Sequence, residues 1–254
     1  MNKRQLLTLA LLPALLAACG GGDDSFDDRA DIADPKVRLV HAIPGAPNVS
    51  LFRDGLAQAS GVTNMPYKGA SDYFDTEGSV HFWEVRTATT PPVTVGSQQF
   101  ETHTGNRYTL VAVPGGGSLT EVVLIADPYN KSIVSNDARV RVFNAAPNTA
   151  GVDVYITAPA VDIAAVAPNL AGAGYKQAVP ASTDDSIDLE GGNYTLRLTA
   201  AGTKTVIFTA PVTLTQNADW LLIPVPASAT PGDVRVLVIQ PSASAPSIEL
   251  LNQP

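Results

Sequence analysis

The chain has 254 residues, of which 45% are hydrophobic and only 16% are charged. This balance argues against an intrinsically disordered protein, because disorder requires low hydrophobicity and many charges. The net charge of −8 argues against binding to nucleic acid, which requires a basic surface. A single cysteine excludes an intrachain disulfide and a cysteine-rich zinc site. The sequence has no P-loop, dinucleotide-binding or zinc-binding motif, so we expect no metal and no cofactor.

The first 18 residues predict a signal peptide that is removed. Lys3 and Arg4 precede an apolar stretch over residues 6–16, which is too short to span a bilayer as a helix. Ala18 and Cys19 then resemble the end of a bacterial lipobox, where cleavage precedes a cysteine that receives a diacylglyceryl group and an N-linked acyl chain such as palmitate. The alternative is an ordinary secreted protein, whose cysteine lies near a cleavage site by chance.

Residues 19–35 are glycine-rich and then acidic, which predicts a flexible tether behind the lipid. The aspartates lack the spacing of a calcium-binding loop. Gly20, rather than aspartate, follows Cys19, and in the lipoprotein resemblance this implies the outer membrane rather than the inner membrane. Loss of Lys3 and Arg4 changes the net charge to −10, so a lipid and not a basic patch would hold the protein to its membrane.

The rest of the chain contains one pattern twice, in residues 36–129 and 138–251, joined by a polar linker over residues 130–137. The segment Val37–Pro44 recurs as Val140–Pro147, and later segments recur in the same order. This period is too long for a solenoid and predicts two complete domains.

Short strands separated by turn residues dominate both units. The alternation in Tyr194–Thr199 is typical of a strand with one buried face, and turn sequences such as Asp54-Gly55 end the strands. Many short strands at this spacing predict an all-β fold of two tandem antiparallel β-sandwich domains, immunoglobulin-like in architecture.

The opening of the first unit, from Val37 through Asp54-Gly55, resembles the bacterial domain-of-unknown-function 4397 family, and the second unit resembles it over residues 139–155 and 191–195. The second unit departs at Asn144, where the family often has histidine, and lacks an Asp-Gly pair after Tyr155. The resemblance implies β-rich domains in envelope lipoproteins. It implies no reaction and supplies no catalytic residues.

His41 is the first candidate for a binding or acid–base role. It precedes a Pro-Gly-Ala-Pro turn, and the simpler interpretation is that its ring hydrogen-bonds the backbone of that turn. Asn144 stands at the equivalent position and cannot titrate, which favours the structural interpretation.

Asp72, Asp75 and Trp83 are the remaining candidates. A carboxylate pair could hydrolyse a glycoside or bind calcium, but neither aspartate has further ligands at a diagnostic spacing, so solvated loop carboxylates are expected. Trp83 lies in the strand-like segment Val80–Val85, where it could stack on a sugar, pack against the second domain or lie in the core.

No sequence signature of a hydrolase, kinase or dinucleotide enzyme is present. We therefore expect a lipid-anchored cell-envelope protein without catalysis, which displays two sandwiches for binding or for a structural role. Its partner would be a polysaccharide, peptidoglycan or another envelope protein. The alternatives are an envelope carbohydrate hydrolase that uses carboxylates of the first unit, or a subunit of a surface assembly. The oligomeric state stays open.

Overall fold

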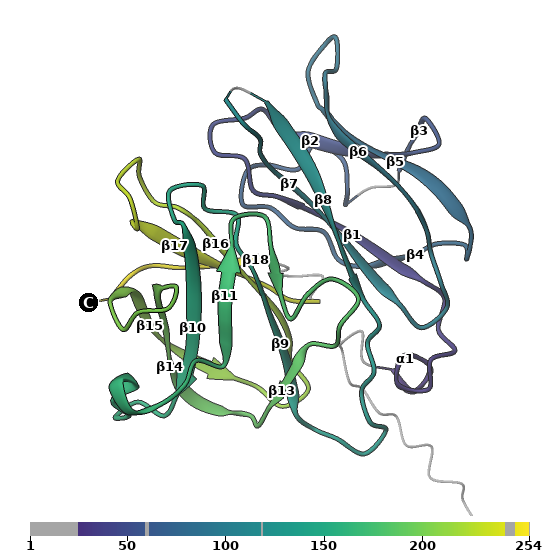
Figure 1. The fold of residues 1–254 in the computed structure, drawn as a ribbon. Helices are drawn as coiled ribbons and strands as arrows, with labels where there is room; N and C mark the ends of the chain where they lie inside the picture. Colours follow the sequence, from purple (N-terminus) through teal and green to yellow (C-terminus); the bar gives the residue numbers. More distant parts are fainter. Residues whose placement is uncertain (1–24, 59–60, 118, 242–246, 254) are drawn as a thin grey trace, which may run out of the picture.

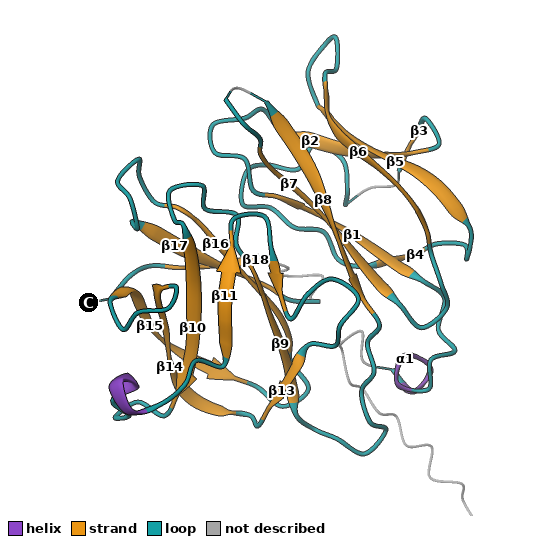
Figure 2. Cartoon of the chain, in the orientation of Figure 1, coloured by secondary structure: helices purple, strands orange, loops and turns teal. Residues whose placement is uncertain are grey.

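The structure is a computed structural model that describes residues 25–58, 61–117, 119–241 and 247–253. It is almost entirely β (Figure 2), which confirms the all-β sandwich class. The helical exceptions among these residues are the short helix α1 (Phe26–Arg29) and one 3₁₀ turn (Ile163–Ala165). Ala18 and Cys19 lie outside the described residues.

The first sandwich consists of two four-stranded sheets. Its inner sheet has the order β4-β1-β7-β8 and its outer sheet the order β3-β2-β5-β6. The strands are β1 (Lys36–His41), β2 (Val49–Arg53), β3 (Leu56–Ala57), β4 (Phe74–Asp75), β5 (Val80–Thr87), β6 (Thr94–Glu101), β7 (Arg107–Pro114) and β8 (Thr120–Asp127).

The second sandwich repeats this order. Its inner sheet runs β12-β9-β16-β17-β18, with β13 also paired to β9, and its outer sheet runs β11-β10-β14-β15. The strands are β9 (Ala138–Phe143), β10 (Gly151–Thr157), β11 (Leu170–Gly174), β12 (Ala178–Val179), β13 (Ile187–Leu189), β14 (Gly192–Ala200), β15 (Val206–Leu214), β16 (Asp219–Pro226), β17 (Val234–Ile239) and β18 (Ser247–Leu250).

One strand pair in each sandwich departs from the expected antiparallel pattern. β1 pairs with β7 in parallel, and β9 pairs with β16 in parallel, whereas the other pairs between the described strands are antiparallel. No hairpin joins the two strands of either parallel pair, because the outer strands β2, β3, β5 and β6 lie between β1 and β7 in the chain, and β10, β11, β14 and β15 lie between β9 and β16.

The burial of the strands distinguishes inner from outer sheets. The outer strand β5 alternates between exposed and buried residues at its start, as a strand with one face in water does. The inner strands β7, β9 and β16 are buried almost without interruption. A strand with both faces covered has a continuous apolar run, which accounts for the segments that do not alternate in the sequence.

The two inner sheets bury each other, forming a seam between the sandwiches (Figure 1). Within β1, Val37 and Leu39 face the core of the first sandwich, whereas Val40 faces the seam. An apolar cluster fills one part of the seam with side chains from both sandwiches: Val40, Ala42, Val111, Val113, Ile125, Phe143, Ala145, Leu221, Ile223, Val225, Leu237 and Ile239. The two sandwiches therefore share a buried apolar layer in addition to their own cores.

The described part of the predicted tether is ordered, which corrects the expectation of flexibility for residues 25–35. The Ser25 hydroxyl and the Asp28 carboxylate cap each other's backbone in a capping box, so four residues suffice to form α1. Asp28 is buried against the body of the protein, and Pro35 leads directly into β1. A buried carboxylate with ion-pair partners provides the packing that a glycine- and aspartate-rich composition does not predict.

Candidate functional site

His41 ends β1 with its side chain fully buried. Its Nε2 atom lies 3.1 Å from the carbonyl oxygen of Pro47, and its Nδ1 atom lies 3.3 Å from the backbone nitrogen of Ile43. This pair of contacts fits a neutral ring whose Nε2–H donates and whose Nδ1 accepts. Burial lowers the pKa of His41, and the hydrogen bond to Pro47 opposes that shift. The ring fixes the turn and does not reach solvent.

Asn144 has the corresponding role in the second sandwich. Its side-chain oxygen accepts from the backbone nitrogen of Ala146, two residues later, just as His41 accepts from Ile43. Its side-chain nitrogen donates to Thr149 and to the carbonyl oxygen of Ala173 at 3.0 Å each. One kind of turn is thus held by two different side chains.

Trp83 belongs to the core of the first sandwich, with 1% of its surface exposed. Its ring lies 6.1 Å from Phe100 in a stacked arrangement and 6.2 Å from Phe74. A ring enclosed in this way has no free face for a sugar. Its neighbours are aromatic side chains of the same sandwich.

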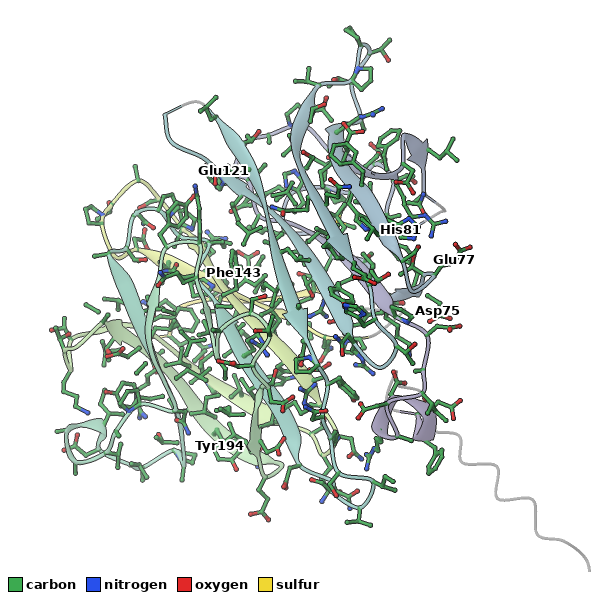
Figure 3. All side chains as sticks on the ribbon, turned by 45° about the vertical axis from the view of Figure 1, so that its right-hand side comes forward. Asp75, Glu77, His81, Glu121, Phe143 and Tyr194 are labelled. Carbon is green, nitrogen blue, oxygen red and sulfur yellow. The ribbon has the colours of Figure 1, made fainter. Side chains whose placement is uncertain are left out.

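The two candidate aspartates flank the edge of the inner sheet. Asp75 lies in β4 and is exposed, and Asp72 is half-buried just before that strand. Figure 3 shows Asp75, Glu77 and His81 on the same side of the molecule. Among the described residues, no group of three histidine, cysteine, aspartate or glutamate side chains is arranged to hold a metal ion.

His81 lies in a chain of hydrogen bonds that sequence reasoning missed. Its Nε2 atom lies 2.9 Å from the Ser79 hydroxyl, and its Nδ1 atom lies 2.8 Å from the Asp54 carboxylate. Asp54 also accepts from the backbone nitrogen of Phe82, and this bond, together with His81, lowers the pKa of Asp54. Asp54 and Gly55 both adopt positive φ, as a tight β-hairpin turn requires. The signal was present as Asp54-Gly55 and Ser79-Val80-His81, but nothing in the sequence brings them together.

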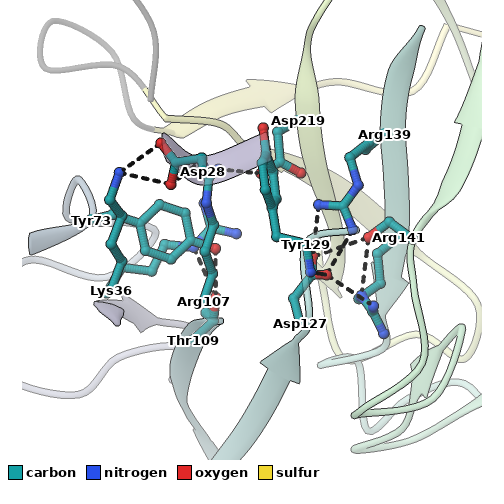
Figure 4. A network of polar contacts seen from close by, with 12 residues as sticks. Asp28, Lys36, Tyr73, Arg107, Thr109, Asp127, Tyr129, Arg139, Arg141 and Asp219 are labelled. Carbon is teal, nitrogen blue, oxygen red and sulfur yellow. Dashed lines mark hydrogen bonds and ion pairs between the residues drawn. The ribbon is translucent and has the colours of Figure 1, made fainter. Parts of the chain in front are cut away.

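The polar part of the seam is a network of buried charges from both sandwiches (Figure 4). Arg107 of the first sandwich contacts Asp219 of the second at 3.0 Å. In the opposite sense, Asp127 of the first sandwich contacts Arg139 of the second at 2.8 Å, with Arg141 at 3.7 Å. Burial raises the pKa of Asp127, but Arg139 and Arg141 outweigh it, so the carboxyl pKa falls below its usual value.

Helix α1 closes this network at the polar end of the seam. Asp28 contacts Arg107 at 3.2 Å and Lys36 at 3.0 Å, with 4% of its side chain exposed. The Tyr129 ring lies against two guanidinium groups, 3.4 Å from Arg107 and 4.3 Å from Arg139, measured from guanidinium carbon to ring centroid. Cation–π contacts and ion pairs thus bridge the sandwiches at one place.

A small cavity of about 10 Å³ lies beside the network. Its lining includes Arg38, Tyr73, Thr109 and Arg141, and it has room for about one water molecule. The Arg38 Nε atom donates to Thr109 at 2.9 Å, whereas its buried Nη1 atom has no partner among the described residues. Arg38 lies in β1 and Arg141 in β9, which are inner strands of the two sandwiches. An arginine inside an apolar strand was the sequence signal for a polar seam.

A larger surface hollow of about 530 Å³ is lined by the connection between β3 and β4 and by β18. Its lining includes Asn64 and Tyr67 of the first sandwich and Ser247 of β18. The Tyr67 hydroxyl is buried and has no hydrogen-bond partner within the described chain. Burial, followed by the nearby Glu249 carboxylate, raises the pKa of Tyr67, so the hydroxyl keeps its proton.

His41 contacts two residues that line this hollow, Tyr67 and Lys68. Its backbone carbonyl accepts from Lys68, and its ring contacts the Tyr67 ring edge-on at 6.1 Å. The second sandwich closes the hollow from its other side, because Ser247 donates to the Lys68 carbonyl oxygen and Glu249 pairs with Lys68 at 2.6 Å. The structure therefore gives His41 a place beneath a candidate binding surface, separated from it by Tyr67.

Residues 35–155 match the sequence profile of a family described as a domain of unknown function, DUF4397. The match runs through the first sandwich and on through β9 to Tyr155 in β10. It supports the family resemblance seen in the opening residues. The comparison with curated proteins finds no match. None of the helices in the described ranges is long and apolar enough to cross a bilayer.

Proposed function

We propose that this protein, whose residues 35–155 belong to the DUF4397 family, is a lipid-anchored protein of the cell envelope. It carries two tandem copies of one domain, held to the outer membrane through Cys19 after cleavage behind Ala18. It acts by binding, without catalysis. The observation that carries this function is the Tyr67 hollow, a surface hollow to which both sandwiches contribute.

The anchor is supported by the position of the single cysteine, directly behind a basic and apolar leader. We expect Cys19→Ser to abolish lipid labelling and leave the protein unprocessed or released from membranes. Labelling with a radioactive or alkyne fatty acid, followed by membrane fractionation, tests this. Unchanged labelling of the variant would contradict the anchor.

The chemistry of the Tyr67 hollow favours an uncharged, hydroxyl-rich ligand such as a polysaccharide. Its one cation, Lys68, is engaged by Glu249, so the hollow offers no free charge to an anionic ligand. Asn64 is exposed and presents an amide, which hydrogen-bonds to hydroxyls, and the half-buried Tyr67 adds ring surface to the wall of the hollow. Small-molecule sites commonly combine an apolar wall with a few polar groups in this way.

Binding is tested with the mature, anchored protein in nanodiscs on an array of envelope glycans, including peptidoglycan fragments. We expect Tyr67→Ala to lose binding, because it removes the ring from the wall of the hollow, and Tyr67→Phe to retain it, because the hydroxyl is buried and the ring stays in place. Tyr194→Phe is the matched control, because its hydroxyl donates to Glu190 away from the hollow. Glycan binding that is identical in all four proteins would place the ligand elsewhere.

A second candidate function rests on Ser79, His81 and Asp54, which have the atom-to-atom connections of a nucleophilic serine site. His81 would take the Ser79 hydroxyl proton as oxygen attacks an acyl carbon, and return it to the leaving group. We rank this role below binding for two reasons. The Asp54 side chain is 51% exposed, and the Ser79 amide already donates to Glu77, so it cannot stabilise an oxyanion.

A fluorophosphonate probe separates the two candidates, because it reacts with activated serines. The binding role predicts that Ser79 remains unlabelled at concentrations that label a reference serine hydrolase. Mass-spectrometric labelling of Ser79 that disappears in His81→Gln and weakens in Asp54→Asn would favour hydrolysis instead.

A further inference from the structure

Exposed apolar side chains gather where the described chain begins. Phe26 in α1 is 63% exposed, and Ile32, just after the helix, is 62% exposed. In the connection between β8 and β9, Ile133 is 54% exposed and Val134 is 87% exposed. Exposing large apolar side chains to water is unfavourable, and covering them with another surface removes that cost. We call these four residues the tether-end patch.

The two segments of the tether-end patch are in direct contact. The Arg29 guanidinium donates to the carbonyl oxygens of Ile133 at 2.9 Å and Ser135 at 2.8 Å. Ile32 is folded back over the helix, since its backbone nitrogen donates to Asp27 at 3.0 Å. Figure 1 shows α1 and the β8–β9 connection at the same end of the molecule. The four side chains thus belong to one surface region.

The proposed lipid anchor lies close to this region along the chain. Cys19 and Ser25 are six residues apart, and a fully extended chain spans at most about 3.6 Å per residue. An acylated Cys19 therefore keeps Ser25 within about 22 Å of the membrane surface. Of the surfaces of the two sandwiches, the one next to Ser25 is the one held at the bilayer.

We propose that the tether-end patch rests on the membrane and inserts its four apolar side chains among the lipid headgroups. This inference depends on the proposed anchor at Cys19. The lipid surface would be zwitterionic, because the exposed carboxylates of Asp27 and Asp31 lie in the same segment and are repelled by anionic lipids. The same carboxylates limit the depth to the interface, where amphipathic segments bury their apolar side chains and keep their charged groups in water.

Docking would give the body one orientation. The loop between β5 and β6 lies at the end of the molecule opposite α1 (Figure 1), and would point away from the bilayer. A second exposed apolar group, formed by Leu56, Val80 and Phe82, lies on the outer sheet of the first sandwich. Its position does not indicate what would cover it, so it carries no proposal.

The test uses the mature, lipidated protein in phosphatidylcholine vesicles. Because Cys19 would be acylated, a cysteine introduced as Ile133→Cys or Val134→Cys is the only free thiol and can carry an environment-sensitive fluorophore. We expect blue-shifted emission and protection from aqueous iodide at both positions. Val93→Cys, equally apolar and exposed in the β5–β6 loop, is the matched control and should remain quenchable.

A second variant pair keeps the result interpretable. The double variant Phe26→Asp, Val134→Asp should stay anchored, but a spin label on its body should rotate more freely than in the wild type. The control Val93→Asp should leave the rotation of that label unchanged. Water-exposed probes at residues 133 and 134 on vesicle-bound protein would overturn the docking proposal. Failure of the wild type to bind vesicles at all would instead overturn the anchor, and with it the docking surface.

Discussion

At the scale of single residues, a buried polar side chain is tolerated where it completes the hydrogen bonds of a turn. His41 and Asn144 both accept from a backbone nitrogen two residues later, and both donate to other groups in their loops. The shared requirement is an acceptor and a donor in fixed positions, and a neutral imidazole and an amide both satisfy it. Only the imidazole adds a dependence on pH.

We therefore predict that His41→Asn removes one component of the pH dependence of stability. The folded protein has a His41 pKa below the ordinary value of 6.5. Below about pH 6.5 the unfolded chain binds the proton more readily, so the free energy of unfolding falls as the pH drops towards the folded pKa. At pH 8 the substitution costs about 1–3 kcal/mol, because a shorter side chain leaves space and loses the Pro47 contact.

Urea unfolding between pH 5 and 8 measures this. His103→Asn is the control, since His103 is exposed, and it should leave the profile as in the wild type. An H41N protein with the same loss of stability on acidification as the wild type would show that another group is responsible.

At the scale of elements, α1 is too short to be stable by itself and depends on one buried side chain. A four-residue helix makes too few hydrogen bonds to compensate for its ordering. Asp28 supplies the missing stabilisation through its contacts with Ser25, Lys36 and Arg107. Burial raises its carboxyl pKa, but the Ser25 hydrogen bond and the two cations outweigh this and lower the pKa below 3.8. The stabilisation is present above that pH and is lost as the pH falls through the folded value.

Asp28→Ala should detach α1 and reduce the free energy of unfolding by about 3 kcal/mol, because it breaks a buried ion pair while Arg107 keeps Asp219. Arg29 would leave the carbonyl oxygens that hold it, so limited trypsin digestion should cut after Arg29 faster than in the wild type. Asp27→Ala, exposed in the same helix, is the matched control with wild-type digestion. Equal cleavage of both variants would argue against the role of Asp28.

At the scale of the whole molecule, the seam joins the sandwiches through apolar packing and crossed ion pairs. Residues such as Ile223 and Leu237 are fully buried only because the other sandwich covers them. Removing the second sandwich would also leave Arg107 and Asp127 without their partners across the seam, which is costly for buried charges. The two sandwiches are therefore expected to unfold together.

Calorimetry should show one transition for the wild type, with equal van't Hoff and calorimetric enthalpies. Ile223→Asp places a carboxylate in the apolar part of the seam without entering either core, so it should separate the melting into two transitions. Val206→Asp, at an exposed position of β15, should retain a single transition close to the wild-type temperature. Two transitions in the wild type would contradict a shared folding unit.

Much of the fold could be predicted because its signals are local. Turn residues such as Asp54-Gly55 and the alternation in β14 identify strands, since a strand exposes one face to water every second residue. The structural role of His41 was also predictable, because a polar ring beside a turn needs backbone partners. Trp83 was ambiguous, since alternation gives two faces without saying which one is covered.

The strands and the turn at His41 could be predicted from the residues alone, because each depends on neighbours within a few residues. Three contacts emerge only in the folded chain: Arg107 pairs with Asp219, His81 connects Asp54 with Ser79, and Asp28 orders the start of the described chain. These contacts join residues far apart along the chain, and composition carries no distance information between them. The same holds for the Tyr67 hollow and the tether-end patch, which exist only where separate segments of the chain meet.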